Sequence, residues 1–334
     1  MNRTLTGWMR DGTLGKRRIA PAAHGARSRG KCQATTPRNF CEKRNSVGAR
    51  RAVREGAIRR FPNRSMIAFT VDAEQWNCPL LEGRPSPEDG NTAFSRDGNA
   101  LLLELFRAYG VRATFFVTGV FAEQEPDQVR LIRSQGHEIA CHGYHHHWRG
   151  NARLDIRAEV VRSKEAVLRV TGERARGFRA PQLQYSETLV EILAAEGFAY
   201  DSSLHPTYLP GAYNHIARPV SVFRPKAGLD VTEIPLAVSP LKLPISWCFM
   251  RLLGVRRTIR CCERLMAKGV APVLYVHSWE YTPIPDRNVP FYYTCRTGRR
   301  FLRDAETLIR AFGGASFTTT GELAARAASA TVAP

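Results

Sequence analysis

Two carboxylates, Asp72 and Glu74, stand two residues apart directly after the apolar, β-branched stretch 67–71. On an extended strand, side chains at this spacing leave the same face of the chain. Either carboxylate alone is typical of a solvated strand end. Two on one face repel each other unless a cation or a proton separates their roles.

Four histidines lie close together in the sequence, at positions 142, 145, 146 and 147. His142 and His146 are four residues apart, and a helical turn would place both imidazoles on one side, where they can share a metal ion. One carboxylate and two imidazoles leave coordination positions open for water and substrate, as hydrolytic metal sites require. For the histidines alone, an adventitious metal-binding loop is the alternative.

Three further polar residues follow short apolar segments. Arg179 comes after the strand-like pair 177–178 and, taken alone, resembles any surface arginine. Asp201 precedes two serines and is equally compatible with a turn cap. His277 ends the apolar run 272–276, which places its imidazole at the edge of the core. A partly buried histidine suits a general acid, although a core histidine with satisfied hydrogen bonds is the usual alternative.

The chain around these residues alternates between expected strands and expected helices. Strands are expected at 67–71, 112–117, 137–141, 177–178, 198–200 and 272–276, and helices at 99–109, 126–135, 154–171, 186–196, 258–268 and 299–312. Repeated strand–helix units with continuous apolar strands predict a parallel sheet, closed or nearly closed. Catalytic groups gather at the carboxyl ends of the strands in α/β barrels, which is where the candidate residues stand.

The positive charge is concentrated at the start of the chain. Of the formal net charge of +19, residues 1–65 contribute 17 basic and 3 acidic side chains, which leaves only +5 for the remainder. This leader lacks the apolar core of a secretory signal. It is interpreted as a disordered basic arm, a targeting sequence or upstream sequence that is not translated. The last is favoured, because Met66 directly precedes the first strand.

The rest of the chain is long and apolar enough to bury a large core. We expect one catalytic domain over 66–325 and a disordered tail over 326–334. A nucleic-acid partner would depend on the leader alone, so none is expected. The apolar stretch 234–253 is interrupted by prolines and charged residues, so no transmembrane segment is expected.

The eight cysteines are spaced irregularly and include no CxxC pair, which argues against zinc-ribbon and thioredoxin-like motifs. Reduced, mostly buried thiols in a cytoplasmic protein explain them. Cys141 would point away from His142 on an expected strand, so it is assigned to the core.

Taken in order, the segments that carry these residues resemble the polysaccharide deacetylase superfamily, the NodB-homology domains of carbohydrate esterase family four. The segments are Val71-Asp72-Ala73-Glu74, Cys141-His142-Gly143-Tyr144-His145-His146-His147, Phe178-Arg179-Ala180-Pro181, Tyr200-Asp201-Ser202-Ser203 and Val276-His277-Ser278-Trp279. Each motif is short, but the ordered set is specific. The chain looks most like the branch with a DVED-type first motif, which is usually tied to exopolysaccharide or cell-envelope gene clusters. The resemblance implies a distorted (β/α) barrel.

The resemblance also implies roles for the metal-side residues. Asp72 would be the general base that takes a proton from a metal-bound water. Glu74, His142 and His146 would hold a divalent metal, with zinc expected. Arg179 would orient and tune Asp72.

The remaining roles concern the leaving group and the substrate. His277 would protonate the departing amine, and Asp201 would raise the pKa of His277 by its opposite charge. The metal and the backbone N–H of Gln182 would stabilise the oxyanion. Pro181, Gln182 and Trp279 are expected to contact the substrate.

The first motif departs from the family's pattern. Where relatives have an acid, this chain has the neutral amide of Gln75, and the site would be weakened or lost if that acid were the ligand. Glu74 is preferred as the ligand, because strand alternation places it beside Asp72. His145 and His147 leave the identity of the second imidazole open.

The predicted function is metal-dependent removal of N-acetyl groups from an N-acetylated sugar or polysaccharide, in exopolysaccharide or cell-envelope biosynthesis. Alternatives are a deformylase of a lipid-linked aminosugar, an allantoinase-like small-amide hydrolase, and a non-catalytic carbohydrate-binding barrel. The joint presence of a candidate acid and base argues against the last. The apolar stretch 241–253 leaves open a lipid-linked sugar and a peripheral membrane contact. The sugar, the acyl group, the metal and the oligomeric state are left undetermined.

Overall fold

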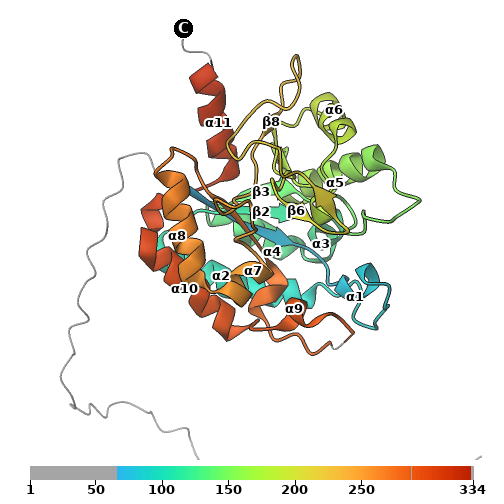
Figure 1. Cartoon of the computed structure of the whole chain (residues 1–334). Helices are drawn as coiled ribbons and strands as arrows, with labels where there is room; N and C mark the ends of the chain where they lie inside the picture. Colours follow the sequence, from blue (N-terminus) through green and yellow to red (C-terminus); the bar gives the residue numbers. More distant parts are fainter. Residues whose placement is uncertain (1–65, 287, 332–334) are drawn as a thin grey trace, which may run out of the picture. The chain divides into compact units, whose positions relative to one another are not determined.

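The computed structural model of the protein describes residues 66–286 and 288–331 (Figure 1). The expected leader, 1–65, lies outside the described residues, and so does the end of the expected tail. The first described element is a strand that begins at Ile67, directly after Met66.

A parallel sheet of eight strands forms the centre of the described part. Its strands are β1 (Ile67–Ala73), β2 (Thr114–Val117), β3 (Glu138–Cys141), β4 (Gly177–Phe178), β5 (Tyr200–Asp201), β8 (Thr232–Glu233), β9 (Val273–His277) and β10 (Phe317–Thr318). Pairing runs in the order β9–β1–β2–β3–β4–β5–β8, with β10 beside the first residues of β1. Because all of these pairs are parallel, the strands end at one edge of the sheet.

The two ends of the sheet approach each other without pairing as strands. The chain that follows β8 reaches β9, where Ala237 N donates to Val273 O at 2.9 Å and Trp247 N donates to Tyr275 O at 3.1 Å. These bonds nearly close the sheet on itself. The fold is a distorted (β/α) barrel, as predicted.

Helices and short turns connect the strands (Figure 1). The helices are α1 (Cys78–Leu81), α2 (Ala93–Tyr109), α3 (Gly119–Gln124), α4 (Pro126–Ser134), α5 (Ile156–Thr171), α6 (Glu187–Ala195), α7 (Cys248–Leu253), α8 (Val255–Met266), α9 (Phe291–Thr294), α10 (Arg299–Phe312) and α11 (Thr320–Thr331). Three 3-10 turns, η1 (Pro181–Leu183), η2 (Ser278–Tyr281) and η3 (Gly314–Ser316), and the antiparallel hairpin of β6 (Tyr208–Leu209) and β7 (Tyr213–Asn214) complete the order. Gly110, with φ +65°, ends α2 in the left-handed conformation that glycine adopts at low cost.

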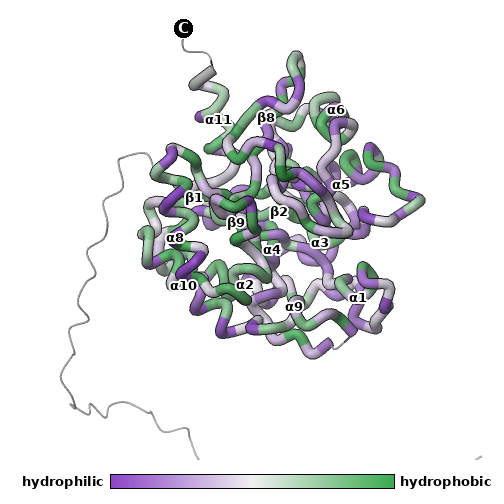
Figure 2. The backbone as a smooth tube through the Cα atoms, viewed as in Figure 1, coloured by the Kyte–Doolittle hydropathy of each residue, from purple (hydrophilic) through white to green (hydrophobic). Residues whose placement is uncertain are grey.

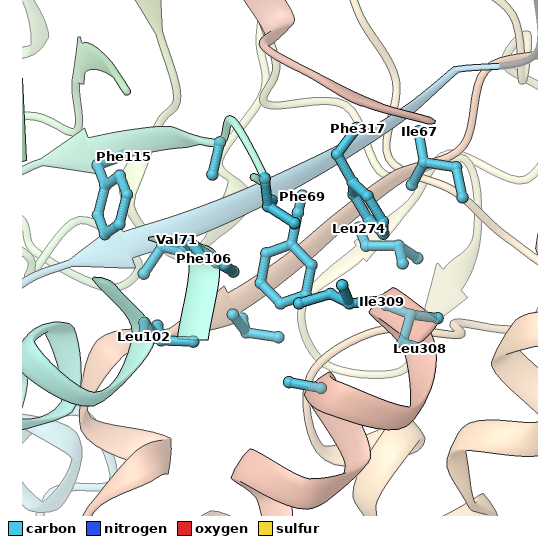
Figure 3. Close-up of a cluster of buried hydrophobic side chains, with 14 of the residues drawn as sticks. Ile67, Phe69, Val71, Leu102, Phe106, Phe115, Leu274, Leu308, Ile309 and Phe317 are labelled. Carbon is cyan, nitrogen blue, oxygen red and sulfur yellow. The ribbon is translucent and has the colours of Figure 1, made fainter. Parts of the chain in front are cut away.

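The main core lies between the sheet and helices α2 and α10 (Figure 3). Phe69 of β1 packs edge-to-face against Phe106 of α2, with ring centroids 5.2 Å apart. Ile309 of α10 belongs to the same buried cluster. Each fully buried side chain of this size contributes about 1.5–3 kcal/mol through the area removed from water. The hydropathy of the chain follows this packing, with apolar strands inside and mixed helices around them (Figure 2).

The end of the chain differs from the sequence expectation. Helix α11 runs to Thr331, so residues 326–331 are helical, and a disordered tail from 326 was a wrong prediction for them. The stretch is rich in alanine, which has the highest helix propensity. The two-residue strands β8 and β10 were not predicted either, since they are too short to show a periodicity.

Two further sequence assignments concern the interior and the membrane. Cys141 is fully buried in an apolar cluster with Val160 and Phe178, as expected for a core thiol. Among the helices that the structure describes, none combines the length and the hydropathy needed to cross a bilayer.

Candidate metal centre and active site

Strand β1 carries the two carboxylates to the edge of the sheet. Asp72 and Glu74 are both buried and both line one cavity, as their spacing predicted. Asp72 pairs in register with His277 of the neighbouring strand β9. The candidate base and the candidate acid therefore lie side by side at the carboxyl ends of two adjacent strands.

A cluster of three buried side chains lies beside them. In Glu74, His142 and His146, one candidate ligand atom from each residue lies within 4.8 Å of the other two. Oε2 of Glu74 is 2.8 Å from Nε2 of His146 and 3.4 Å from Nε2 of His142. One carboxylate and two imidazoles form a donor set that suits zinc and similar divalent ions.

Hydrogen bonds orient each of these side chains from behind. His142 Nδ1 lies 2.8 Å from the backbone oxygen of Arg179, and His146 Nδ1 lies 3.1 Å from Oδ1 of Asn77. Since both partners are oxygen acceptors, each ring carries its proton on Nδ1 and keeps the Nε2 lone pair for a metal. Trp279 Nε1 donates to Oε1 of Glu74 at 3.0 Å.

Two atoms at the centre of the cluster have no hydrogen-bond partner among the described residues. They are Oε2 of Glu74 and Nε2 of His142, and both are buried. Leaving such a group unsatisfied costs about 1–3 kcal/mol, and a cation between them would remove that cost. Burial raises the pKa of Glu74, but His146, His277 and His142 together lower it by more, so that this pKa lies well below its usual range. The residues therefore fit a divalent metal.

The two imidazoles do not share a helical turn, contrary to the prediction from their spacing. They lie on the loop that follows β3, where residues 142–148 form neither helix nor strand. Gly143 reverses this loop with φ +68°, and a Cβ there would come within 2.8 Å of Cγ of Pro181. Packing of the loop against η1, rather than helix periodicity, brings His142 and His146 together.

The neighbouring candidates are outside the cluster. His145 and His147 are not part of it, and the ring of His145 is half exposed. Oε1 of Gln75 accepts a hydrogen bond from Oγ1 of Thr118 at 2.9 Å, and Gln75 does not line the cavity. The structure thus places Glu74, not Gln75, among the candidate ligands.

Arg179 holds Asp72 in a fixed orientation. The guanidinium is fully buried, and its Nη1 donates to Oδ1 of Asp72 at 2.7 Å and to Oγ1 of Thr70 at 2.8 Å. Its Nε donates to the backbone oxygen of Ser202 at 3.1 Å. The ion pair occupies Oδ1 of Asp72, while Oδ2 lies 3.9 Å from Nε2 of His142. The carboxylate is therefore positioned beside the cluster without being one of its ligands.

His277 is paired with Glu280, and Asp201 is not among the carboxylates that raise its pKa, contrary to the prediction. Oε2 of Glu280 accepts from the backbone N of His277 at 2.8 Å and lies 3.4 Å from its Nδ1. Oε1 of Glu280 accepts from Nε of Arg251 at 2.7 Å, and both residues are fully buried. Asp201 instead accepts a hydrogen bond from Oγ of Ser203. The sequence contained a signal for Glu280, because it follows His277 by three residues, one 3-10 turn.

The pKa of His277 depends on three carboxylates. Burial lowers it, but Glu74, Glu280 and Asp72 raise it by more, so that the pKa lies above its ordinary value. Its ring stacks on Trp279, with centroids 4.8 Å apart, and lines the cavity. A histidine that holds its proton near neutral pH suits proton donation.

The residues expected to contact substrate are at or near the cavity. Gln182 lines it with a left-handed backbone, φ +54°, and Oε1 of Gln182 accepts from the backbone N of Trp148 and of Arg149 at 2.9 and 2.7 Å. Trp279 also lines the cavity. Pro181 does not line the cavity and packs against Gly143. Their contact with a substrate stays a prediction.

The cavity above the cluster has a volume of about 590 Å³. Apolar and aromatic residues make up most of its lining, among them Leu81, Leu183, Leu209, Tyr213, Trp247, Phe249, Leu252, Tyr275, Trp279, Phe291, Tyr292 and Tyr293. A few convergent polar groups at one end of an apolar cavity are typical of a small-molecule site.

A protein-family model matches the part of the chain that carries most of these site residues. The model described as polysaccharide deacetylase matches residues 64–200, which contain Glu74, both clustered imidazoles and Arg179. This part of the chain is a polysaccharide deacetylase domain. The resemblance inferred from the ordered motifs is thereby confirmed, while its assignment to the DVED-type branch stays a prediction.

Known proteins resemble this polysaccharide deacetylase domain at two levels. The peptidoglycan deacetylase of Helicobacter pylori is 33% identical over 154 residues, which are 43% of this chain and 52% of that protein. The chain thus spans about half the length of this relative. A polysaccharide deacetylase structure from Mycobacterium smegmatis covers 80% of this chain and 91% of its own, with a TM-score of 0.57 at 23% identity. The allantoinase Puue covers 80% and 90%, with a TM-score of 0.55 at 16% identity. At these identities the two structures show a shared fold.

Proposed function

We propose that the protein is a metal-dependent hydrolase that removes N-acetyl groups from an N-acetylated sugar or polysaccharide. One observation carries the proposal: Asp72 and His277, a candidate base and acid, are neighbours in register and both border the Glu74 cluster. A binding protein has no need of an acid and a base beside a candidate metal site. The family match over residues 64–200 supports the same reaction class.

A divalent ion held by Glu74, His142 and His146 would supply Lewis acidity toward water and the amide carbonyl. Asp72 would take the proton of the attacking water, since Arg179 holds its Oδ1 and leaves Oδ2 toward the cluster. The bond between the carbonyl carbon and nitrogen then breaks, and the nitrogen leaves as an amine after it has received a proton.

His277 is placed to donate that proton. Nε2 of His277 lies 4.0 Å from Oε1 of Glu74, and the imidazole lines the cavity. Glu280 orients the ring through Nδ1, and Arg251 holds Glu280 in turn. Glu280 also raises the pKa of His277, which is the role that Asp201 was expected to have.

The substrate class is the finer part of the proposal. The similarity to a peptidoglycan deacetylase over half of that protein's length supports an N-acetylated glycan. The aromatic and aliphatic lining of the cavity favours a sugar with an apolar attachment, such as a lipid-linked aminosugar. We further propose zinc as the metal, a role in exopolysaccharide or cell-envelope synthesis, and a cytoplasmic location.

The apolar lining of the cavity is also compatible with a second candidate function, deformylation of a lipid-linked aminosugar. A formyl group differs from an acetyl group by one methyl, and the cavity has room for either. The allantoinase Puue has the same fold, but the fold by itself does not carry a substrate to this chain.

The first experiment measures metal content and acyl release on the same preparation. Elemental analysis should find about one divalent ion per chain, and an N-acetylated chito-oligosaccharide should release acetate. Asp72→Asn should keep the metal and lose turnover, and His142→Ala should lose both. Turnover that survives in metal-stripped Asp72→Asn protein would contradict the mechanism. Formate release from N-formylated sugars, without acetate release, would select the second candidate.

A further inference from the structure

Asp201 and Glu233 form a pair of carboxyl groups that the proposed reaction does not use. They are register partners on the adjacent parallel strands β5 and β8. Both are fully buried. Neighbouring strands are about 4.8 Å apart, so two acidic side chains meet here without access to water.

Each carboxyl group uses one oxygen and leaves the other unsatisfied. Oδ1 of Asp201 accepts from Oγ of Ser203 at 2.5 Å, and Oε1 of Glu233 accepts from the backbone N of Leu204 at 3.0 Å. Oδ2 of Asp201 and Oε2 of Glu233 are buried and have no hydrogen-bond partner in the described part of the chain. Two acceptors cannot satisfy each other, but one proton between them satisfies both.

The surroundings do not compensate for two negative charges. Arg179 is the cation that acts on both groups, and it already forms its ion pair with Asp72. The pair also acts on Tyr185, which is neutral at ordinary pH, because burial and the carboxylates raise its pKa to about 12. Two adjacent buried carboxylates repel strongly, and sharing one proton removes that repulsion.

We propose that Asp201 and Glu233 share one proton and act as a positioning pair for Arg179. Oε2 of Glu233 holds the proton and donates a hydrogen bond to Oδ2 of Asp201, so that the pair carries a single negative charge. This inference concerns how the site is supported, so it does not depend on the reaction proposed above.

The pair is connected to the active site by short hydrogen-bonded steps. Asp201 accepts from Ser203, and Oγ of Ser203 accepts from the backbone N of Ala180 at 2.7 Å. The adjacent Ser202 accepts from Arg179 through its backbone oxygen and its Oγ, each at 3.1 Å. The turn after β5 therefore holds the turn after β4, which presents Arg179 to Asp72.

The directions of the two pKa values agree with this arrangement. Burial raises the pKa of Asp201 to about 6, against the hydrogen bonds from Ser203 and Glu233. Burial, and then the charge of Asp201, raise the pKa of Glu233 well above its usual range. Glu233 is thus the member that keeps the proton.

The test compares single amide substitutions by infrared spectroscopy near pH 6.5. Wild-type protein should show the carbonyl band of a protonated carboxyl group, shifted in D2O. The band should vanish in Glu233→Gln and also in Asp201→Asn, because an amide supplies the hydrogen that the shared proton supplied. A wild type without the band would overturn the proposal, as would a band that survives in Asp201→Asn, since Glu233 would then be protonated on its own.

Thermal unfolding gives a second readout. As pH rises above the ordinary pKa of a glutamate, the unfolded chain releases the Glu233 proton while the folded chain keeps it, so the wild type loses stability. Glu233→Gln has no such proton. Between pH 5 and pH 8, the melting temperature of Glu233→Gln relative to that of the wild type should therefore rise by on the order of 5 °C.

A difference in melting temperature that does not change with pH would overturn the proposal. So would a calcium-dependent rise in the melting temperature of the wild type that is absent from Glu233→Gln, since a cation would then bridge the pair. Metal content equal to wild type in both variants shows that the Glu74 cluster is intact.

Discussion

Glu280 lies beneath His277, with Oε2 3.4 Å from Nδ1 of the ring and 2.8 Å from its backbone N. The other carboxylate oxygen accepts from Nε of Arg251, and the side chains of Glu280 and Arg251 have no exposed surface. The candidate proton donor is thus supported by a buried ion pair between Glu280 of η2 and Arg251 of α7. The arrangement leaves Nε2 of His277 as the ring atom that faces the cavity.

We expect Glu280→Gln to lower kcat by roughly 10- to 100-fold while the metal content stays unchanged, because the ring of His277 loses the partner that orients it. Steady-state kinetics on an N-acetylated chito-oligosaccharide measures this. Glu82→Gln is the matched control, since Glu82 also lines the cavity but bonds to Tyr293 rather than to His277. Equal losses in both variants would show that a cavity charge matters and that the orientation of His277 does not.

Arg251→Met should destabilise the protein by about 3–5 kcal/mol, because it leaves the carboxylate of Glu280 buried without a partner. Urea unfolding monitored by tryptophan fluorescence gives the free energy of unfolding. Arg310→Met is the control: its ion pair with Glu306 lies at the surface, where solvent screens it, so this variant should be far less destabilised. A loss below 1 kcal/mol in Arg251→Met would mean that the Glu280 site relaxes or takes up a proton.

Metal binding should distinguish between neighbouring histidines. His146→Ala should lose the metal, because its Nε2 belongs to the cluster, whereas His145→Ala should retain it, because that ring is half exposed and bonds to Glu159. Gln75→Ala should also retain the metal. Elemental analysis of the three proteins checks this. Metal loss in Gln75→Ala would place the amide, rather than Glu74, in the coordination sphere.

The rim of the cavity should recognise an apolar attachment on the sugar. Phe291 and Leu252 line the cavity and are exposed by 70% and 36%, so each can contact a hydrocarbon chain. We expect Phe291→Ser to reduce kcat/KM for an octyl glycoside of N-acetylglucosamine about tenfold and to leave kcat/KM for the methyl glycoside within about twofold, since burial of a few methylene groups is at stake. Leu131→Ser is the control, because Leu131 is also an exposed apolar side chain but does not line the cavity. Equal effects on both glycosides would remove the apolar attachment from the proposal.

The free energy of unfolding should decrease as the pH is lowered, because His137 is buried in its neutral form. Burial lowers its pKa to about 4, and its Nδ1 accepts from the backbone N of Ala113 at 3.2 Å. Above about pH 6.5 the ring is neutral in both states and has no effect on the pH dependence. Below that, only the unfolded chain takes up the proton, so the free energy of unfolding should decline down to about pH 4, by about 3 kcal/mol in all. Urea unfolding across this range measures the decline, and His137→Asn should be less stable overall but show a shallower slope. Parallel slopes would assign the acid sensitivity to other groups.

Local patterns determined much of this protein. The apolar stretch 67–71 and the spacing of Asp72 and Glu74 predicted a strand whose two carboxylates share a face, and β1 shows this. The alternation of strands and helices predicted a parallel barrel, and the ordered motifs identified the polysaccharide deacetylase domain. Such inferences succeed because backbone periodicity and strand ends are local properties of a sequence.

Tertiary structure decided which side chains meet. The loop around Gly143, not a helical turn, joins His142 to His146, and the partner of His277 is Glu280 rather than Asp201. Asp201 meets Glu233 because β5 and β8 are adjacent in the sheet, a relation between residues 32 positions apart that no spacing rule contains. Strand order and loop packing set such contacts, and these depend on the whole buried core rather than on any short stretch of sequence.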